Sequence, residues 1–558
     1  MKIGQQAQSP DPHLINDDIR PASAKERHWS VTNMASLWIG MVVCVPTYTL
    51  AGGLVKEGMN WWQAVLTIML GNLIVLVPMV LNGHAGTKYG VPFPVLARAS
   101  FGIRGAHVPS LLRALVATGW FGIQTWFGGF AIYQLVNALF DKVEHTLTGA
   151  ELLAWGHTDE LATLYGAVPG AQALIEQGEW AALAASAELS GTFTFGVLEG
   201  AQLPFLGINS FELLCFLVFW ALQIAIIYKG IESIRVLETF AAPFLIGIGV
   251  VLLGWAYVKA GGFGAMLAMP SAFDAGGPRE GEFLKVFVPS LTAMVGFWAT
   301  LSLNIPDFTR YAKSQRDQIL GQAIGLPTTM TFFAFISVAV TSATTVIFAD
   351  PITGALAEPI WDPTILAGRI GGGFTVVLSL LALAVATLST NIAANVVSPA
   401  NALINANPRR FTFQMGGYLT AGIGLAILPW KLIASTGGYI FTWLVGYSAL
   451  LGPIVAILIM DYFVLRRTRL DLDNLYRQNG LYSYTGGFNI AALVAFVVAV
   501  LPNIPGFLHQ AGAFGDGVIP PVFDTIYTYA WFVGFFLASV IYLVLMKTIP
   551  HGSIPEEA

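Results

Sequence analysis

The chain has 558 residues, of which 55% are hydrophobic and only 11% are charged. Its mean hydropathy of +0.68 excludes a water-soluble globular protein of ordinary composition and predicts an all-α polytopic membrane protein. Cys44 and Cys215 both lie in apolar segments and are too few for a disulfide framework or a metal site, and the net charge of -5 identifies no partner.

Apolar runs long enough to cross the roughly 30 Å hydrocarbon core recur along the chain, and each predicts a transmembrane helix. We count twelve, near 31–55, 62–83, 110–140, 209–228, 236–258, 286–305, 319–348, 373–405, 412–430, 436–464, 488–505 and 526–547.

Lys and Arg residues are distributed unevenly between the connections. With a cytoplasmic N-terminus, the inside segments hold 20 of the 27 basic residues, so we predict that both termini are cytoplasmic. The polar N-terminal segment lacks a short apolar core followed by a small-residue cleavage site. We therefore expect no signal peptide, and the first span would serve as the insertion signal.

The first span contains Gly40 and, near its middle, Pro46. Because proline removes a backbone donor, a break in this helix is predicted. A broken span exposes carbonyl and amide groups at membrane depth, which is tolerated where they line a cavity or bind a ligand. The alternative is a proline kink without functional consequence.

The third and sixth spans carry aromatic residues beside glycines. Trp120 and Gln124 are four residues apart, so they share one helix face, although packing for the indole and helix association for the amide remain alternatives. Gly296 and Trp298 lie near the middle of the sixth span, where we predict an interruption like that in the first.

The eighth span contains an uncharged but polar stretch, 386–399, with Ser389, Thr390, Asn391 and Asn395 at helical spacing. Unpaired buried amides cost roughly 1–3 kcal/mol each. These groups should therefore hydrogen-bond to another helix, to water, or to a molecule that the protein binds and releases.

Two pairs of spans share features: spans one and six by interruption, and spans three and eight by a polar pair. This correspondence favours an inverted-repeat transporter with a site near the membrane midplane. The resulting organisation is an N-terminal cytoplasmic segment, two five-span repeats, two peripheral spans and a cytoplasmic tail, at residues 1–30, 31–258, 286–464, 488–547 and 548–558.

Two connections stand out. Residues 141–208 form an acidic extracytoplasmic insertion in which an alanine-rich stretch, 179–189, is expected to be a surface helix, and no catalytic or metal-ligand spacing occurs there. Residues 88–104 combine prolines, aromatic residues and two arginines, which predicts a short surface helix on the cytoplasmic side.

The sequence carries no phosphate loop, no zinc-protease motif and no carboxylate pair within a span. We therefore expect neither an enzyme nor a bound cofactor. Ionisable residues are absent from the middle of spans one, three, six and eight, which favours coupling to sodium held by neutral oxygens over a proton relay. Ser389 and Thr390 could supply hydroxyl ligands, or could bond to their own helix.

A flat organic ring could lie between two indoles, those of Trp120 and Trp298, and stacking contributes about 1–3 kcal/mol per ring. The side-chain amides of Gln124, Asn391 and Asn395 could then pair with its edge, and such a site rejects analogues that leave its amides unpaired.

Several long segments resemble the nucleobase:cation symporter family of the first class, over roughly residues 26–485. They occur in family order at 26–29, 97–105, 120–126, 305–311, 389–395 with Ser398 and Pro399, and 461–463. The resemblance implies a LeuT-type five-plus-five inverted repeat with two additional C-terminal helices, and transport by alternating access.

The resemblance also implies residue roles. The ring would be stacked by Trp120 and Trp298 and hydrogen-bonded by Gln124, Asn395 and Asn391. Sodium would be bound by backbone oxygens of Gly40, Val43 and Ala386 and by the hydroxyls of Ser389 and Thr390.

Two substrate-site positions depart from the hydantoin transporters of the family. Cys44 replaces a glutamine that contacts the substrate there, and Phe297 replaces a glycine. These differences put hydantoin itself in question.

The function predicted is sodium-driven import of a small planar amide-bearing ring, such as a nucleobase, hydantoin or allantoin. Proton coupling and a membrane sensor that binds such a ring without moving it are the alternatives. We expect a monomer in the bacterial inner or plasma membrane, with the ring, the cation and the lipid bilayer as partners and no nucleic acid.

Overall fold

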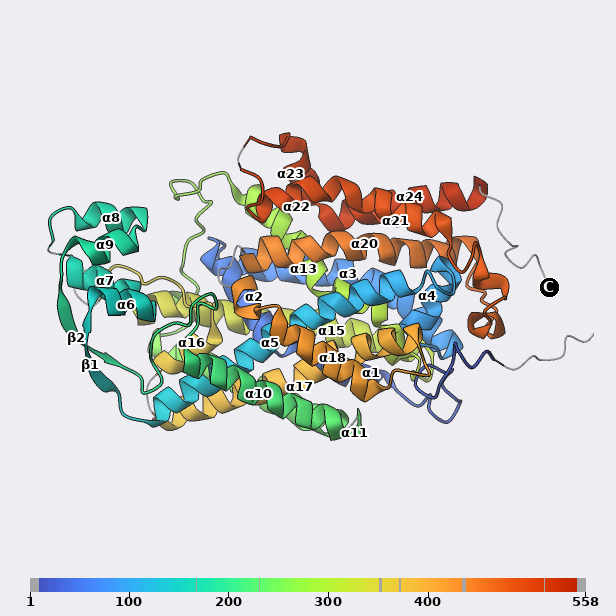
Figure 1. Ribbon diagram of the computed structural model, residues 1–558, viewed down its shortest axis with the longest axis horizontal. Coiled ribbons are helices and arrows are strands. Elements are labelled where there is room, and N and C mark those ends of the chain that lie inside the picture. The colour runs from blue at the N-terminus through green and yellow to red at the C-terminus, as the bar shows by residue number, and fades with distance from the viewer. Residues whose placement is uncertain are drawn as a thin grey trace, which may run out of the picture. The chain divides into compact units, whose positions relative to one another are not determined.

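The computed structural model is built almost entirely from helices (Figure 1). It describes residues 10–548 except 167, 230, 351–353, 371–372, 434–437 and 516, so nearly all of the predicted tail, 548–558, lies outside the described residues. The chain divides into two compact units. The first comprises Met1–Gln124, Ile226–Asp362 and Ser389–Ala558, and the second comprises Thr125–Ala225 and Pro363–Leu388.

Each predicted apolar segment coincides with one helix or with adjoining helices. These are α1 (Val31–Val42) with α2 (Val45–Lys56), α3 (Trp61–Tyr89), α5 (His107–Leu139), α10 (Ser210–Lys229), α11 (Ile231–Lys259), α13 (Phe283–Asn304), α15 (Gln315–Ile347), α17 (Gly373–Ala406), α18 (Phe413–Ala426), α20 (Val445–Ile459) with the π-helical turns η1 (Gly438–Leu444) and η2 (Met460–Leu465), α21 (Ile490–Val500) and α24 (Ala530–Thr548).

Within the described residues, eight helices are long and apolar enough to cross a membrane, or nine when the bent pair α1 and α2 counts as one span. One of the eight is the run Ile490–Gln510, which begins with α21 and continues through two shorter helices. The 14 residues of α18 are fewer than the roughly 20 that a perpendicular helix needs. Shorter helices join the long ones: α12 (Phe263–Met266), α14 (Pro306–Thr309), α16 (Pro363–Arg369), α19 (Pro429–Leu432), α22 (Ile504–Gln510), α23 (Pro521–Thr528), η3 (Asp473–Tyr476), η4 (Leu481–Ser483) and η5 (Leu501–Asn503).

The predicted break in the first span is confirmed. The α1 and α2 helices are bent by 59° at Val43 and Cys44, and Pro46 lies in the first turn of α2, where a missing N–H is tolerated. The predicted interruption of the sixth span is wrong, because α13 runs unbroken through Gly296 and Trp298.

The helix predicted within 88–104 exists as α4 (Phe93–Phe101), but its predicted surface position is wrong, since all nine residues are buried. The guanidinium of Arg98 donates to Asn405 Oδ1 and to the carbonyls of Leu475 and Leu14. The N-terminal segment and the loop after α20 therefore cover this helix, which an apolar count along the chain cannot show.

The α21 and α24 helices lie side by side along α20 (Figure 1). In the first turn of η2, the buried carboxylate of Asp461 pairs with Arg466 at 2.7 Å and accepts a hydrogen bond from Tyr542 of α24 at 2.9 Å. A buried ion pair with a tyrosine donor thus joins the last helix to the helix bundle of the first unit.

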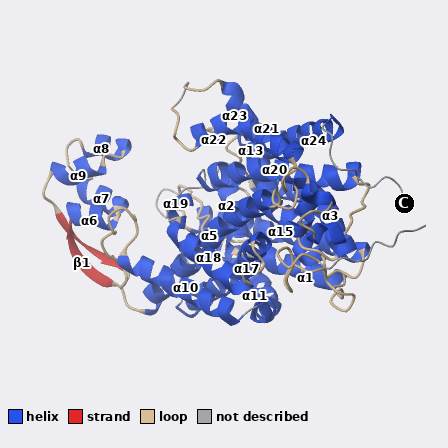
Figure 2. Ribbon diagram, turned by 45° about the vertical axis from the view of Figure 1, so that its right-hand side comes forward, coloured by secondary structure: helices blue, strands red, loops and turns tan. Residues whose placement is uncertain are grey.

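In the second unit, the insertion folds as a small subdomain with its own core. Its two antiparallel strands, β1 (Val143–Thr148) and β2 (Ser190–Phe195), are the pair of strands in Figure 2. Four helices, α6 (Gly149–Trp155), α7 (Thr158–Tyr165), α8 (Ala171–Gln177) and α9 (Trp180–Ser186), lie between the strands in sequence.

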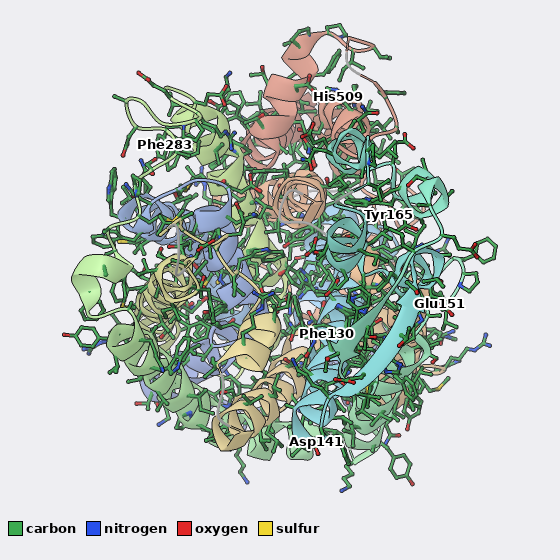
Figure 3. The ribbon with its side chains drawn as sticks, turned by 90° about the vertical axis from the view of Figure 1, so that its left-hand side faces the viewer. Phe130, Asp141, Glu151, Tyr165, Phe283 and His509 are labelled. Atoms are coloured by element: carbon green, nitrogen blue, oxygen red, sulfur yellow. The ribbon has the colours of Figure 1, made fainter. Side chains whose placement is uncertain are left out.

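The subdomain buries an apolar cluster that includes Leu152, Leu161 and Leu183. Tyr165, labelled with Glu151 in Figure 3, donates to the carbonyls of Ala184 and Ala187. The helix expected within 179–189 is therefore present as α9, as part of a packed unit.

Candidate functional site

A small cavity lies within the first unit, between α1, the break that follows it, α5, α13 and α17. Its volume is about 30 Å³. Its walls are Met41, Cys44, Trp120, Gln124, Phe297, Trp298, Thr300, Leu301, Thr390, Ala394 and Asn395. Six of the seven residues proposed from the sequence to contact a ring therefore meet at one place. The cavity holds roughly one or two water molecules, so a ring requires it to widen.

Aromatic side chains form the apolar part of the wall. Phe297 lies edge-to-face with both indoles, with ring centroids 5.3 Å from Trp120 and 4.9 Å from Trp298. Trp38 also packs edge-to-face against Trp298, with the ring centroids 5.3 Å apart. The indoles are thus held in fixed orientations, and Phe297 contacts both of them.

The polar part of the wall comes from α5 and α17. Asn395 Nδ2 donates to Asn391 Oδ1 at 2.9 Å, and Asn391 Nδ2 donates to the carbonyl of Phe121 at 3.0 Å. Asn391, which the sequence predicts to contact the ring, is not among the residues that line the cavity. Its amide connects α17 to the backbone of α5 and orients Asn395.

Two buried polar atoms beside the cavity have no hydrogen-bond partner among the described residues, Gln124 Oε1 and Trp298 Nε1. Both residues are only 4% exposed. Leaving such a group unpaired costs about 1–3 kcal/mol. The Gln124 oxygen is an acceptor and the Trp298 N–H is a donor, so together they favour a ligand that offers both a hydrogen-bond donor and an acceptor. Amide and imide edges of planar rings do so.

The helix break lies beside α17. Thr390 Oγ1 donates to the carbonyl of Gly40 at 3.4 Å, so this hydroxyl does not bond to its own helix. Ser389 is also buried, and Val43 is at the break itself, while Cys44 Sγ is 3.3 Å from Thr47 Oγ1. Ala386, the remaining residue proposed to bind sodium, belongs to the portion of α17 in the second unit.

Sequence reasoning missed Arg113, which it counted with a cytoplasmic connection. Arg113 is fully buried in α5, where its Nε donates to the carbonyl of Thr300 at 2.8 Å and to Asn304 Oδ1 at 3.0 Å. Asn304 Nδ2 is in turn 3.4 Å from Asp307 Oδ2. Since Thr300 lines the cavity, Arg113 positions its wall on α13. The signal that could have identified Arg113 is its position within the apolar segment 110–140, where an arginine is expected to be buried among helices.

Comparisons with known proteins agree with this arrangement. The sequence model of the family described as "permease for cytosine/purines, uracil, thiamine, allantoin" matches residues 21–175 and 180–534. A purine-uracil permease of Arabidopsis thaliana is 45% identical over 97% of this chain and 79% of its own length. An allantoin permease of Bacillus subtilis is 36% identical over 100% of this chain and 98% of its own length.

Solved structures agree on the fold. A nucleobase-cation-symport-1 family transporter, in a closed conformation with bromovinylhydantoin bound, matches with a TM-score of 0.67 at 25% identity, covering 98% of each chain. A sodium-coupled sialic acid symporter, at 11% identity, matches with a TM-score of 0.56 over 95% of this chain and 93% of its own and shares the fold alone. The chain is therefore an integral membrane permease, not an enzyme, and belongs to the family for cytosine, purines, uracil, thiamine and allantoin, the nucleobase:cation symporters of the first class.

Proposed function

We propose that this protein is a secondary active symporter that imports a small planar amide-bearing ring of the nucleobase, hydantoin or allantoin type. The observation that carries the proposal is the small cavity with two indoles and the unpaired Gln124 Oε1 and Trp298 Nε1 in or beside its wall. Indole faces stack with flat rings, and the two polar atoms select a ring edge with both a donor and an acceptor.

Phe297 limits the size of that ring. It touches both indoles, and the cavity between these walls has only about 30 Å³. We therefore favour rings without a large substituent, such as uracil or allantoin, over aryl-substituted hydantoins. The names of the purine-uracil and allantoin permeases support the same class of substrate.

Sodium is the proposed coupling ion. The break between α1 and α2 frees carbonyl groups near Gly40 and Val43, and the Thr390 hydroxyl already contacts the Gly40 carbonyl. Hard cations prefer such neutral oxygen ligands. The described walls of the cavity contain no Asp, Glu or His that could relay a proton. The buried hydroxyl of Ser389 would add a further oxygen to the ion site.

We further propose the arrangement that such transport needs. It comprises twelve membrane helices, two inverted five-helix repeats, two peripheral helices and alternating access in a monomer of the bacterial plasma membrane. The excess of Lys and Arg in alternate connections, 20 of 27 along the sequence and still 19 once Arg113 of α5 is left out, supports cytoplasmic termini. Since the first span is broken and α13 is continuous, the proposed symmetry between the halves does not extend to matching interruptions.

Uptake into vesicles containing the purified protein tests this function. Labelled uracil, cytosine, allantoin and benzylhydantoin are offered with and without an inward sodium gradient. We expect sodium-stimulated uptake of one of the small rings. Uptake that ignores sodium but stops with a protonophore would replace sodium by protons, and binding of none of the rings would refute the site.

The role of Gln124 has a matched control. Replacing it with leucine, Gln124→Leu, should weaken ring binding roughly tenfold, the value of about one neutral hydrogen bond or slightly more. Gln322→Leu removes a buried glutamine of α15 that also has an unpaired Oε1 but does not line the cavity. Equal losses of ring affinity in both variants would contradict a direct contact by Gln124.

A further inference from the structure

A second, larger cavity of about 580 Å³ lies in the first unit, away from the ring site. Four separate segments form its wall: residues 13–14 of the N-terminal segment, residues 103–107 from the turn after α4 to the first residue of α5, residues 405–407 at and just beyond the end of α17, and residues 478–487 around η4. Its polar side chains include those of His13, Arg104, His107, Asn405 and Asn407.

The charge of this cavity is one-sided. Among the described residues that line it, Arg104 carries a full charge and none is Asp or Glu, while the carboxylate of Asp11, outside the wall, accepts from the backbone N–H of His13 at 2.8 Å. Behind Asn405 lies Arg98, which is fully buried and donates to neutral oxygens only: Asn405 Oδ1 at 2.7 and 3.1 Å and the carbonyls of Leu14 and Leu475. No carboxylate within 4 Å of Arg98 occurs among the described residues, so this guanidinium adds an uncompensated positive charge.

The hydrogen bonds of Asn405 also determine which ring nitrogen of His107 can donate a hydrogen bond. With its oxygen occupied by Arg98, its Nδ2 is 3.4 Å from His107 Nδ1. When His107 Nδ1 accepts from that amide, the ring proton lies on Nε2, which then acts as a donor. His107 is the first residue of the 33-residue α5 helix, whose N-terminus adds partial positive charge.

We propose that this cavity is a binding site for a phosphate-bearing anion, held by Arg104, His107 and the neighbouring carboxamides. A guanidinium matches phosphate oxygens in pairs, and the remaining donors are neutral N–H groups that suit the other oxygens. The phosphate could belong to a soluble metabolite or to a lipid headgroup. In either case the anion would contact both the N-terminal segment and the end of α17, the helix that carries Thr390 and Asn395.

Thermal unfolding of the full-length protein in an uncharged detergent tests the site. Inorganic phosphate is titrated at constant ionic strength set with chloride, and the unfolding midpoint is recorded. We expect a saturable rise of the midpoint in the wild type, because a ligand that binds only the folded state raises it with concentration. The variant Arg104→Gln should bind phosphate about tenfold more weakly, and Arg104→Gln with His107→Gln should lose the rise.

The matched control is Arg469→Gln, which removes another exposed arginine that does not line the cavity. Because Arg104 is itself exposed, its single substitution should leave the fold intact. The same variants in nanodiscs of phosphatidylglycerol or phosphatidylcholine distinguish the source. A stabilisation seen only with phosphatidylglycerol and lost in Arg104→Gln identifies a lipid headgroup.

No stabilisation by either phosphate source, or equal stabilisation of Arg104→Gln and Arg469→Gln, would overturn the proposal. The measurement does not involve ring transport, so its outcome is independent of the function proposed above.

Discussion

The α1–α2 pair and α13 carry similar sequence signals but differ in structure. Both combine glycine and aromatic residues within an apolar run, yet the first is bent by 59° and the second is continuous. In the first, Pro46 follows directly after the break. In α13, the only proline, Pro289, lies in the second turn, seven residues before Gly296, and the helix continues past it.

Gly296 serves packing, not flexibility. A Cβ at this position would lie 2.9 Å from the carbonyl oxygen of Leu444 and 3.0 Å from Ser448 Cβ, so its absence lets the η1–α20 segment approach α13 closely. A glycine in a membrane helix can therefore mark a close contact with another helix, whereas the proline at the start of α2 follows a break in the helix.

The largest effect on stability should come from adding a side chain at Gly296, where α13 meets the η1–α20 segment. Gly296→Val places a branched side chain against Leu444 and should lower the free energy of unfolding by about 3 kcal/mol, the upper range for overpacking. The matched control is Gly422→Val in α18, where a Cβ would meet nothing within 4 Å. The unfolding midpoint in detergent measures both. Similar losses in the two variants would mean that helix propensity, not packing, decides the effect.

The second test replaces each of the two prolines, Pro46 and Pro289, with alanine. Pro46→Ala lets α1 continue into α2 and should weaken the proposed sodium affinity by roughly thirtyfold, about 2 kcal/mol of the cost that proline imposes on a continuous helix. Pro289→Ala should leave sodium affinity unchanged, since α13 is already continuous. Sodium titrations of ring binding provide the measurement. An unchanged sodium affinity in Pro46→Ala would separate the break from the ion site.

Much of this architecture follows from the sequence, because hydropathy and helical spacing are local. They place the apolar segments, the break near Pro46 and the shared face of Trp120 and Gln124, and the structure puts these two residues in one cavity wall. The binding roles of these residues, and the sodium ligands, remain predictions that the experiments above address.

What the sequence could not supply depends on contacts between distant segments. The burial of α4 requires the N-terminal segment and the loop after α20 to cover it. The turn of Asn391 toward the Phe121 carbonyl and the contact of Phe297 with two indoles arise from how α5, α13 and α17 pack together.

A third test concerns the contact between the break and α17. Thr390→Val removes the hydroxyl that donates to the Gly40 carbonyl and should weaken sodium affinity about fivefold, the value of roughly 1 kcal/mol for one hydrogen bond. Thr420→Val is the control, because that buried hydroxyl donates within its own helix to the Gly416 carbonyl. Sodium-dependent ring binding is again the readout, and equal effects would argue against a specific role for Thr390.

The smallest expected effect concerns Phe297, the residue of α13 next to Trp298. Phe297→Ala opens space between the indoles and should shift the ratio of benzylhydantoin to uracil binding about fourfold toward the larger ring, the value of one further buried methylene. The control is Phe333→Ala, a comparably buried phenylalanine of α15 outside the cavity wall. Competition binding measures the ratio, and the unfolding midpoint of each variant accounts for lost packing. Because α13 is continuous at this point, the change should alter the size of the ring accepted while leaving sodium affinity as it is; a loss of sodium affinity in Phe297→Ala would instead connect the two sites through α13.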